Sequence, residues 1–385
     1  MELRGDPNGG QVRTAASDGA ACAVGADEAL AADGDAARGA EEALALRLCA
    51  LTGEFYRANA ESFSQARQSP WQGWVRLLEV MGETRAQAGC EPGVLRAADG
   101  ASEGVGGGKM RVATDEEGRG RACAVADAGA SGREPLCVLD LACGNLRFER
   151  YLADALPGRV LSGYAVDNCD PLVEAGERNE SDAVSRIAFQ NLDAIERLSA
   201  GCLRGALEAP DASCDLAVSF GFMHHVPLER WRAGLLRALV AKVRPGGFVA
   251  VSFWRFLNSD KLARKAKETT SRARAELGIP ELPGNDYLLG WQDTQGLYRY
   301  CHHFDEPEIE RLLAMVADSA GLVSRFEADG KTGNLNEYVV LRVKYGAAAV
   351  RIVRRQPPRS RFRIRLCKQL LARAGNDCRT RDQIR

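Results

Sequence analysis

A turn of small residues follows an apolar run in the middle of the chain. Residues 136–139 are apolar, and Asp140, Ala142, Gly144 and Asn145 come directly after them. Small side chains between a strand and a helix let a ligand approach the backbone, and the first turn of the helix offers free N–H groups. The spacing therefore predicts that this turn binds a cofactor.

An acidic residue ends the next predicted strand. Asp167, followed by Asn168, lies 27 residues after Asp140, and an acid there can accept hydrogen bonds from both ribose hydroxyls of a nucleoside. The glycine pattern of a dinucleotide site is incomplete, because Ala142 and Leu146 stand where glycines would admit a pyrophosphate. The residues therefore indicate a nucleoside-containing cofactor that lacks a pyrophosphate.

All four histidines fall in two doublets, His224-His225 and His302-His303. Adjacent histidines on a strand or loop point apart, and no obvious carboxylate accompanies them, so we predict no metal site. The interpretation that we favour is that His224, His225 and His302 position an acceptor. The alternative is that each histidine is a satisfied core or surface group.

Seven short apolar runs alternate with helical patterns between residues 135 and 345. Strands are predicted over residues 136–139, 160–166, 187–190, 216–220, 248–253, 322–326 and 338–343. Helices are predicted over residues 148–156, 171–179, 228–243 and 306–317. This alternation favours an α/β fold with a doubly wound, mostly parallel seven-stranded sheet of the Rossmann-like kind.

The chain on either side of this core differs in composition. Residues 1–45 are rich in Ala, Gly and Asp with a net charge of −6, and we expect a disordered leader. Residues 46–81 show helical spacing broken at Ser69-Pro70, which predicts two N-terminal helices. Residues 82–134 predict a low-complexity insertion. Residues 346–385 form a tail with a net charge of +10.

The composition excludes several classes of protein. The chain has 385 residues and a formal net charge of −1, which does not fit a uniformly basic nucleic-acid-binding protein. No run of about 18 apolar residues predicts a membrane span, and the first 20 residues lack the apolar core of a secretion signal. None of the 12 cysteines forms a C-x-x-C pair, so we expect reduced thiols in a cytoplasmic protein.

The turn and the predicted strand ends resemble the motifs of class I S-adenosylmethionine-dependent methyltransferases. Residues 140–146 resemble motif I with two glycines replaced, residues 215–225 resemble motif IV, and residues 243–247 resemble the turn before the fifth strand. The resemblance implies S-adenosylmethionine as the cofactor. The cofactor-binding residues are then expected to be Asp140, Ala142, Gly144, Asn145, Asp167, Asn168, Leu192, Asp193, Ser219, Phe220 and Gly221.

Three further segments resemble the carboxyl methyltransferases that act on 5-carboxymethyluridine at the tRNA wobble position. Residues 55–71 resemble the N-terminal helices of that family, residues 251–254 its fifth strand, and residues 286–304 its substrate region. The resemblance extends over residues 48–81 and 136–343. It implies a carboxylate as the methyl acceptor.

A carboxylate is already ionised at neutral pH and needs positioning more than it needs a base. Arg67 and Arg299 are the candidates for a bidentate contact with it, and the alternative is that each forms a surface ion pair. Six aromatic residues could stack on an unstacked base or pack over the site. They are Trp71, Trp254, Tyr287, Trp291, Tyr298 and Tyr300.

Three functions stay open at this point. The leading hypothesis is methyl transfer to a carboxylate on a modified tRNA wobble uridine, with tRNA as partner and, as the resemblance implies, a small activating protein. The first alternative is an enzyme of the same fold that methylates a small-molecule carboxylate or hydroxyl. The second is a catalytically silent protein that binds the cofactor or RNA. The basic tail could track RNA phosphates or be a solvated extension.

Overall fold

The computed structural model describes four stretches of the chain, residues 19–87, 135–177, 185–292 and 294–346. Most of the expected insertion, almost all of the basic tail and the first part of the expected leader lie outside the described residues.

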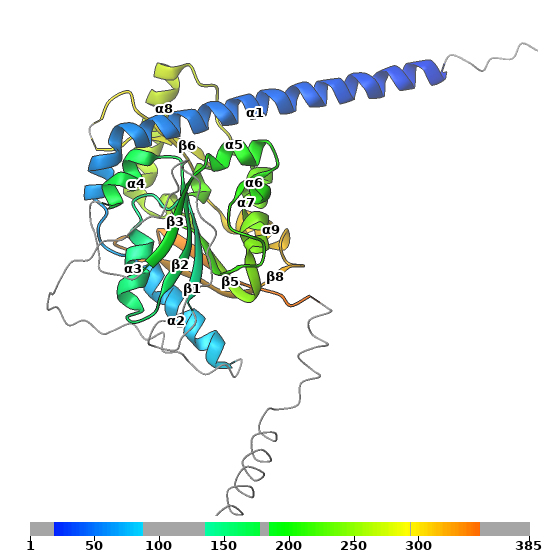
Figure 1. Ribbon diagram of the computed structural model, residues 1–385. Coiled ribbons are helices and arrows are strands. Elements are labelled where there is room, and N and C mark those ends of the chain that lie inside the picture. The colour runs from blue at the N-terminus through cyan, green and yellow to red at the C-terminus, as the bar shows by residue number, and fades with distance from the viewer. Residues whose placement is uncertain (1–18, 88–134, 178–184, 293, 347–385) are drawn as a thin grey trace, which may run out of the picture.

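A seven-stranded sheet forms the centre of the molecule (Figure 1). Its strand order is β3-β2-β1-β4-β5-β9-β8. Neighbouring strands among β1 to β5 are parallel, and β9 is antiparallel to both β5 and β8. The strands are β1 (Leu136–Leu141), β2 (Leu161–Asp167), β3 (Ser185–Asn191), β4 (Cys214–Ser219), β5 (Val243–Trp254), β8 (Ala320–Ala328) and β9 (Asn336–Val343). The predicted doubly wound, mostly parallel sheet is confirmed.

The central strands are buried on both faces, which explains their nearly continuous apolar sequences. Every residue of β4 is buried. One face of the sheet packs against α2 and α3, and the other packs against α5, α6, α7 and α9 (Figure 1). The helices on these two faces are α2 (Gln72–Gln87), α3 (Arg147–Ala155), α5 (Ala194–Ser199), α6 (Leu203–Ala206), α7 (Glu229–Lys242) and α9 (Glu306–Ala314).

Two helices precede the sheet, and they are separated near Pro70 as the sequence predicts. The first, α1 (Gly19–Gln65), begins well before residue 46. Residues 19–45, which were expected to belong to a disordered leader, are therefore helical in the structure. Alanine has the highest helix propensity, and Ala45 is buried in the core, which together explain the longer helix. Toward its N-terminus α1 runs away from the body of the molecule (Figure 1).

A smaller layer lies beside α1. It consists of the antiparallel strands β6 (Asp286–Leu289) and β7 (Arg299–His302), together with α8 (Asp260–Leu277). α1 contacts both β7 and the short helix α4 (Asp170–Glu177), and β7 also contacts the 3₁₀ turn η1 (Met223–His225) after β4. A second 3₁₀ turn, η2 (Phe256–Asn258), follows β5. These contacts bring α1, β7 and η1 together at the C-terminal edge of the parallel strands.

No helix within the described residues has the length and apolarity needed to cross a membrane.

Candidate active site

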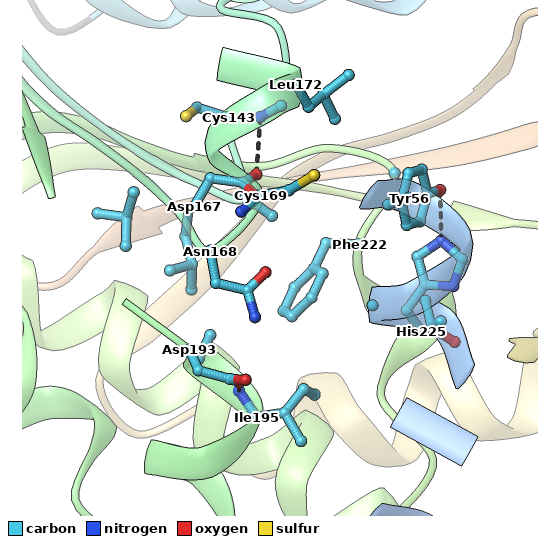
Figure 2. A pocket seen from close by; sticks show the side chains of 18 of the residues that line it. Tyr56, Cys143, Asp167, Asn168, Cys169, Leu172, Asp193, Ile195, Phe222 and His225 are labelled. Carbon is cyan, nitrogen blue, oxygen red and sulfur yellow. Dashed lines mark hydrogen bonds between the residues drawn. The ribbon is translucent and has the colours of Figure 1, made fainter. Parts of the chain in front are cut away.

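A cavity of about 530 Å³ lies where the C-terminal ends of the parallel strands meet α1. Parallel sheets bind ligands at this edge, and the volume suits a small molecule. Figure 2 shows part of the wall, with Phe222 between Asn168 and the Tyr56–His225 pair. The predicted residues that line the cavity are Arg67, Trp71, Asp140, Ala142, Gly144, Asn145, Asp167, Asn168, Leu192, Asp193, Phe220, Gly221 and His225. Ser219, the last residue of β4, is fully buried and is not part of this lining.

The turn after β1 has an uncommon backbone conformation. Ala142 (φ 68°), Gly144 (φ 56°) and Leu146 (φ 55°) are all left-handed, which costs a non-glycine residue roughly 1 kcal/mol or more. The N–H of Ala142 donates to the carbonyl of Val166 at 2.7 Å, and the N–H of Gly144 donates to Asp167 Oδ2 at 2.9 Å. The turn is therefore fixed against the end of β2.

Two predicted acids in the wall are held by backbone donors. Asp167 Oδ1 accepts from the N–H of Cys169 at 2.9 Å, and Oδ2 accepts from Gly144. Burial raises the pKa of Asp167, although these N–H groups oppose the shift. Asp193 Oδ1 caps α5 by accepting from the N–H of Ile195 at 2.9 Å. Both carboxylates are therefore positioned by the protein itself.

A third acid in the wall, Asp140, lacks such donors. Its Oδ1 is buried and has no hydrogen-bond partner within the described part of the chain. Glu149, on α3, is also fully buried behind it, and burial is the main reason why the pKa of Glu149 rises to about 7. Burial and the proximity of Glu149 raise the pKa of Asp140 as well. The wall therefore offers an unsatisfied acceptor that suits a ligand with N–H donors.

The segment between α1 and α2 closes one side of the cavity. Asn145 Nδ2 donates to Ser64 Oγ at 3.2 Å and to the carbonyl of Arg67 at 3.4 Å. The Trp71 ring lies over Gly221, where an added Cβ would come within 3.1 Å of Trp71 Cη2. The turn after β1 is thereby tied to the segment that carries Arg67 and Trp71.

Arg299, which is buried, and Arg67, which is half-buried, form a cationic pair next to the cavity. The Arg67 guanidinium lies 4.0 Å from the centre of the Phe63 ring. Arg299 is only 5% exposed and lies within 6.0 Å of five aromatic ring centres. Within the described residues neither forms an ion pair with a carboxylate, and Arg299 Nε and Nη1 have no hydrogen-bond partner. Burial, followed by the charge of Arg299, lowers the pKa of Arg67 to about 10.

His225 lies between the cavity and the smaller layer. Its Nδ1 is 2.6 Å from the carbonyl oxygen of Tyr300, and its Nε2 is 2.9 Å from the hydroxyl of Tyr56. Burial, followed by the charge of Arg299, lowers the pKa of His225 to about 3. The ring centre of His224 lies 4.1 Å from that of His225, and burial also lowers its pKa. Both rings are neutral at physiological pH.

Three buried side chains in this region could be considered as metal ligands. His224, His225 and Cys301 each place a donor atom within 4.8 Å of the others. However, both ring nitrogens of His225 already have partners, and the charge of Arg299 acts directly on Cys301. A metal ion would face a buried guanidinium, so the geometry does not favour a metal centre.

The structure places His302, which was predicted to position the acceptor, in a separate buried network. Its Nδ1 lies 2.5 Å from Asp286 Oδ1, and its Nε2 lies 2.6 Å from Glu308 Oε2. The hydroxyl of Tyr300 donates to the same Asp286 oxygen at 2.6 Å. Side chains alternate along a strand, so Arg299 faces the aromatic cluster while Tyr300 and His302 face this network. These two residues stabilise the smaller layer and do not line the cavity.

The six predicted aromatic residues divide into two groups. Those that surround the arginine pair or line the cavity are Trp71, Trp254 and Trp291. Tyr287 packs against Phe256 with ring centres 5.4 Å apart, and the Tyr298 hydroxyl donates to Glu276 at 2.5 Å. Tyr287, Tyr298 and Tyr300 therefore pack the smaller layer instead of the cavity wall.

Tyr56 and Phe63 belong to the cavity wall but were not among the predicted site residues. Their spacing carries the signal that would have found them. Tyr56 and Phe63 are seven positions apart on α1, which places them on one face of that helix, and Arg67 follows just after α1 ends at Gln65. Aromatic residues at helical spacing directly before a candidate arginine are therefore expected to lie beside it.

Residues 138–247 match a protein family described as "Methyltransferase domain". Among solved structures, the chain is similar to a SAM-dependent methyltransferase from Methanosarcina mazei, with 17% identity and a TM-score of 0.40 over 56% of this chain and 95% of that chain. It is also similar to the 1,6-didemethyltoxoflavin-N1-methyltransferase of Burkholderia thailandensis, with 20% identity and a TM-score of 0.33 over 55% of this chain and 72% of that chain. A search of the curated proteins found no match.

The match of residues 138–247 to a methyltransferase domain, together with the strand order and the acids at the strand ends, supports S-adenosylmethionine-dependent methyltransferase activity on a Rossmann-like fold. The residues present fit this cofactor. Asp167 ends β2, where it could accept hydrogen bonds from ribose hydroxyls, and the unpartnered Asp140 Oδ1 suits the ammonium of the methionine moiety. When bound, S-adenosylmethionine supplies a methyl group on a positively charged sulfur.

Proposed function

We propose that this methyltransferase esterifies a carboxylate on a modified wobble uridine of tRNA. The observation that carries the proposal is the pair formed by the buried Arg299 and the half-buried Arg67, neither of which has an acidic partner in the described residues. Leaving a buried charge without a counter-charge is unfavourable. An anionic acceptor would supply the counter-charge and fill the free donors of Arg299, whereas a hydroxyl or amine acceptor would not.

The side chains around this pair suit a reaction that needs alignment and exclusion of water. A carboxylate has no proton to lose at neutral pH, and the neutral His225 has both ring nitrogens occupied. Arg67 and Arg299 could hold the two carboxylate oxygens through charge-assisted hydrogen bonds. The surrounding aromatic rings exclude water from the acceptor. The product of the proposed transfer is a methyl ester.

The tRNA part of the proposal rests on the resemblance of residues 55–71, 251–254 and 286–304 to the wobble-uridine enzymes. Trp254 and Trp291 lie beside Arg299, and Trp71 lines the cavity, so all three offer surfaces on which a base could stack. Because Arg299 is 5% exposed, the modified base would have to be unstacked to bring its carboxylate to the guanidinium. A small activating protein, which the resemblance also implies, belongs to the same proposal.

The test uses methyl-labelled S-adenosylmethionine and three acceptor pools, each with and without cell extract as a source of an activating protein. The pools are tRNA containing 5-carboxymethyluridine, tRNA without it, and a small-molecule extract. We expect label only in the first pool, and we expect mild alkali to release it because esters hydrolyse where N-methyl and ether groups do not. Alkali-stable label would contradict a carboxylate acceptor. Label confined to the small-molecule extract would instead support the small-molecule alternative.

A further inference from the structure

The backbone next to Arg299 is held from two sides. The N–H of Tyr300 donates to Thr52 Oγ1 on α1 at 3.0 Å, and the carbonyl of Tyr300 accepts from His225 Nδ1 at 2.6 Å. Both backbone polar groups of Tyr300 are therefore satisfied by side chains from other elements. This fixes the place of Arg299 relative to α1 and η1.

The hydrogen-bond partners of His225 determine where the protons of His225 and Tyr56 lie. A carbonyl oxygen can only accept, so Nδ1 of His225 must carry a proton. Because the ring is neutral, Nε2 then has a lone pair, and the Tyr56 hydroxyl must donate to it across 2.9 Å. His225 is thus held in one tautomer, and the Tyr56 proton points at His225.

The Tyr56 oxygen consequently presents only lone pairs to its other neighbours. The neighbouring cation is Arg299, whose guanidinium carbon lies 5.9 Å from the centre of the Tyr56 ring. Burial opposes the charge of Arg299, but the neighbouring Tyr56 and Cys301 side chains outweigh this effect and raise the pKa of the guanidinium. Phe55, the residue before Tyr56 on α1, lies 4.9 Å from the same guanidinium. Two consecutive residues of α1 are therefore among the groups that surround the guanidinium.

We propose that Tyr56 is a positioning residue: its hydroxyl, ordered by His225 and the Tyr300 carbonyl, holds the Arg299 guanidinium ready for an anionic acceptor. This inference rests on the proposed function for its meaning in catalysis. The proton order itself does not depend on the identity of the substrate, and it can be measured separately.

The first measurement is the ¹⁵N spectrum of the histidine rings in the full-length protein. The chain has only four histidines, and His225→Gln identifies the signals of His225. We expect Nδ1 protonated and Nε2 unprotonated from pH 5 to 8, without titration. Tyr56→Phe should shift the Nε2 signal while Nδ1 stays protonated. A protonated Nε2, or titration within this range, would overturn the proposed proton order.

The second measurement is the affinity of the site for acetate, a carboxylate probe, followed on the His225 ring signals. We expect Tyr56→Phe to weaken acetate binding about tenfold, the effect of losing one hydrogen bond near a charge. Tyr345→Phe makes the same chemical change at a half-exposed position and should leave binding unaltered. Equal acetate affinity in Tyr56→Phe and the unaltered protein would refute the positioning role.

The third measurement is methylation of tRNA that contains 5-carboxymethyluridine. Tyr56→Phe should raise KM for this tRNA about tenfold with a smaller change in kcat. His225→Gln, which keeps one donor and one acceptor, should retain more activity than His225→Leu, which keeps neither. If the unaltered enzyme does not methylate this tRNA, the proposed function fails, while the spectra and acetate binding still decide the role of Tyr56. A normal KM in Tyr56→Phe would contradict the inference alone.

Discussion

At the scale of single residues, the proposed choice of a carboxylate acceptor depends on Arg67 and Arg299. Arg299 lies in an aromatic cluster that offers it no counter-charge, and Arg67 stacks on Phe63 nearby. Aromatic rings stabilise a guanidinium through their faces and leave its in-plane N–H donors free. This arrangement presents hydrogen-bond donors in a fork that matches a carboxylate.

Replacing the guanidinium of Arg299 by a group with the same charge tests whether the paired N–H donors bind the acceptor. We expect Arg299→Lys to lower kcat/KM for the carboxylate acceptor about 100-fold, because a lysine cannot make the bidentate contact. Affinity for S-adenosylmethionine, measured by calorimetry, should stay within about twofold. Arg76→Lys makes the same change in an exposed residue that pairs with Glu79, and it should have no effect. Similar losses in both variants would argue against a role in acceptor binding.

Glu149, the buried acid next to Asp140, gives a prediction of increased stability instead of lost activity. Burial raises the pKa of Glu149 to about 7, so the folded protein holds its proton more tightly than the unfolded chain does. This contribution to stability is complete below about pH 4.5 and is lost as the pH rises toward 7. Glu149→Gln removes the titrating group, and we expect it to raise Tm at pH 8 by about 3 °C. The gain should shrink at pH 5, and a pH-independent gain would mean that titration is not the cause.

Residues at strand ends could be predicted from the sequence, whereas residues on β7 could not. Asp140, Asp167 and Asp193 follow apolar runs, and parallel strands bring such ends to one edge. On β7 the side chains alternate between the aromatic cluster and the His302 network, so a shift of one position decides the role. The sequence does not specify which side chains of β7 point toward the aromatic cluster and which point toward the network. It therefore predicted that Arg299 and His302 both position the acceptor, although only Arg299 lies in the aromatic cluster beside the cavity.

At the scale of elements, the segment between α1 and α2 and the loop after β4 fit together closely. Gly221 has a φ of 71°, and Trp71 lies directly over it. Two separate constraints therefore require glycine at this position: the left-handed backbone and the space taken by the indole ring. Both residues line the cavity.

Substitutions can separate these two constraints. We expect Gly221→Ala to lower the free energy of unfolding by about 1–2 kcal/mol and to weaken binding of S-adenosylmethionine. Adding Trp71→Phe should restore the stability that is lost through the steric contact with the indole ring. It should not restore the stability that is lost through the strained backbone. Chemical denaturation of the single and double variants measures both. Full recovery in the double variant would show that backbone strain contributes nothing.

Two elements show why the sequence predicted the sheet better than the layer beside it. The strands of the sheet are apolar runs, but α8 buries only Ala266, Thr269 and Ala273 along its length. Small residues of this kind give no apolar periodicity, because close backbone contact takes the place of large side chains. The predicted fifth strand began at residue 248, whereas β5 begins at Val243 and passes through Pro245. However, the pairing of β5 with β4 passes directly from Val243 to Phe248, and Gly246 has a φ of 83°. Residues 244–247 therefore form an irregularity of the kind that proline and glycine predict, and regular pairing begins at Phe248 as predicted.

At the scale of the whole molecule, buried neutral histidines make folding sensitive to acid. The pKa of His225 is lowered to about 3 in the folded protein, against an ordinary value of about 6.5 in the unfolded chain. The unfolded chain therefore binds more protons between these values, so this contribution is complete above about pH 6.5 and is lost as the pH falls toward 3. By pH 5 we expect a loss of about 1–2 kcal/mol relative to pH 7.5. Urea unfolding of the unaltered protein and of His225→Gln at both pH values measures the contribution of His225 to stability. If both proteins lose the same free energy of unfolding between these pH values, His225 is not the cause of the acid sensitivity.

The backbone of Tyr300 also connects α1, which lines the cavity, with β7, which carries the arginine proposed to bind the acceptor. Thr52 and Tyr56 on α1 line the cofactor cavity, and the same helix holds β7, which carries Arg299. Any movement of α1 that opens the cavity to admit S-adenosylmethionine would displace the guanidinium from its place. We therefore expect a compulsory order of addition in which the cofactor binds before the acceptor. Product-inhibition kinetics would reveal this order, because S-adenosylhomocysteine would then compete with S-adenosylmethionine but not with the acceptor.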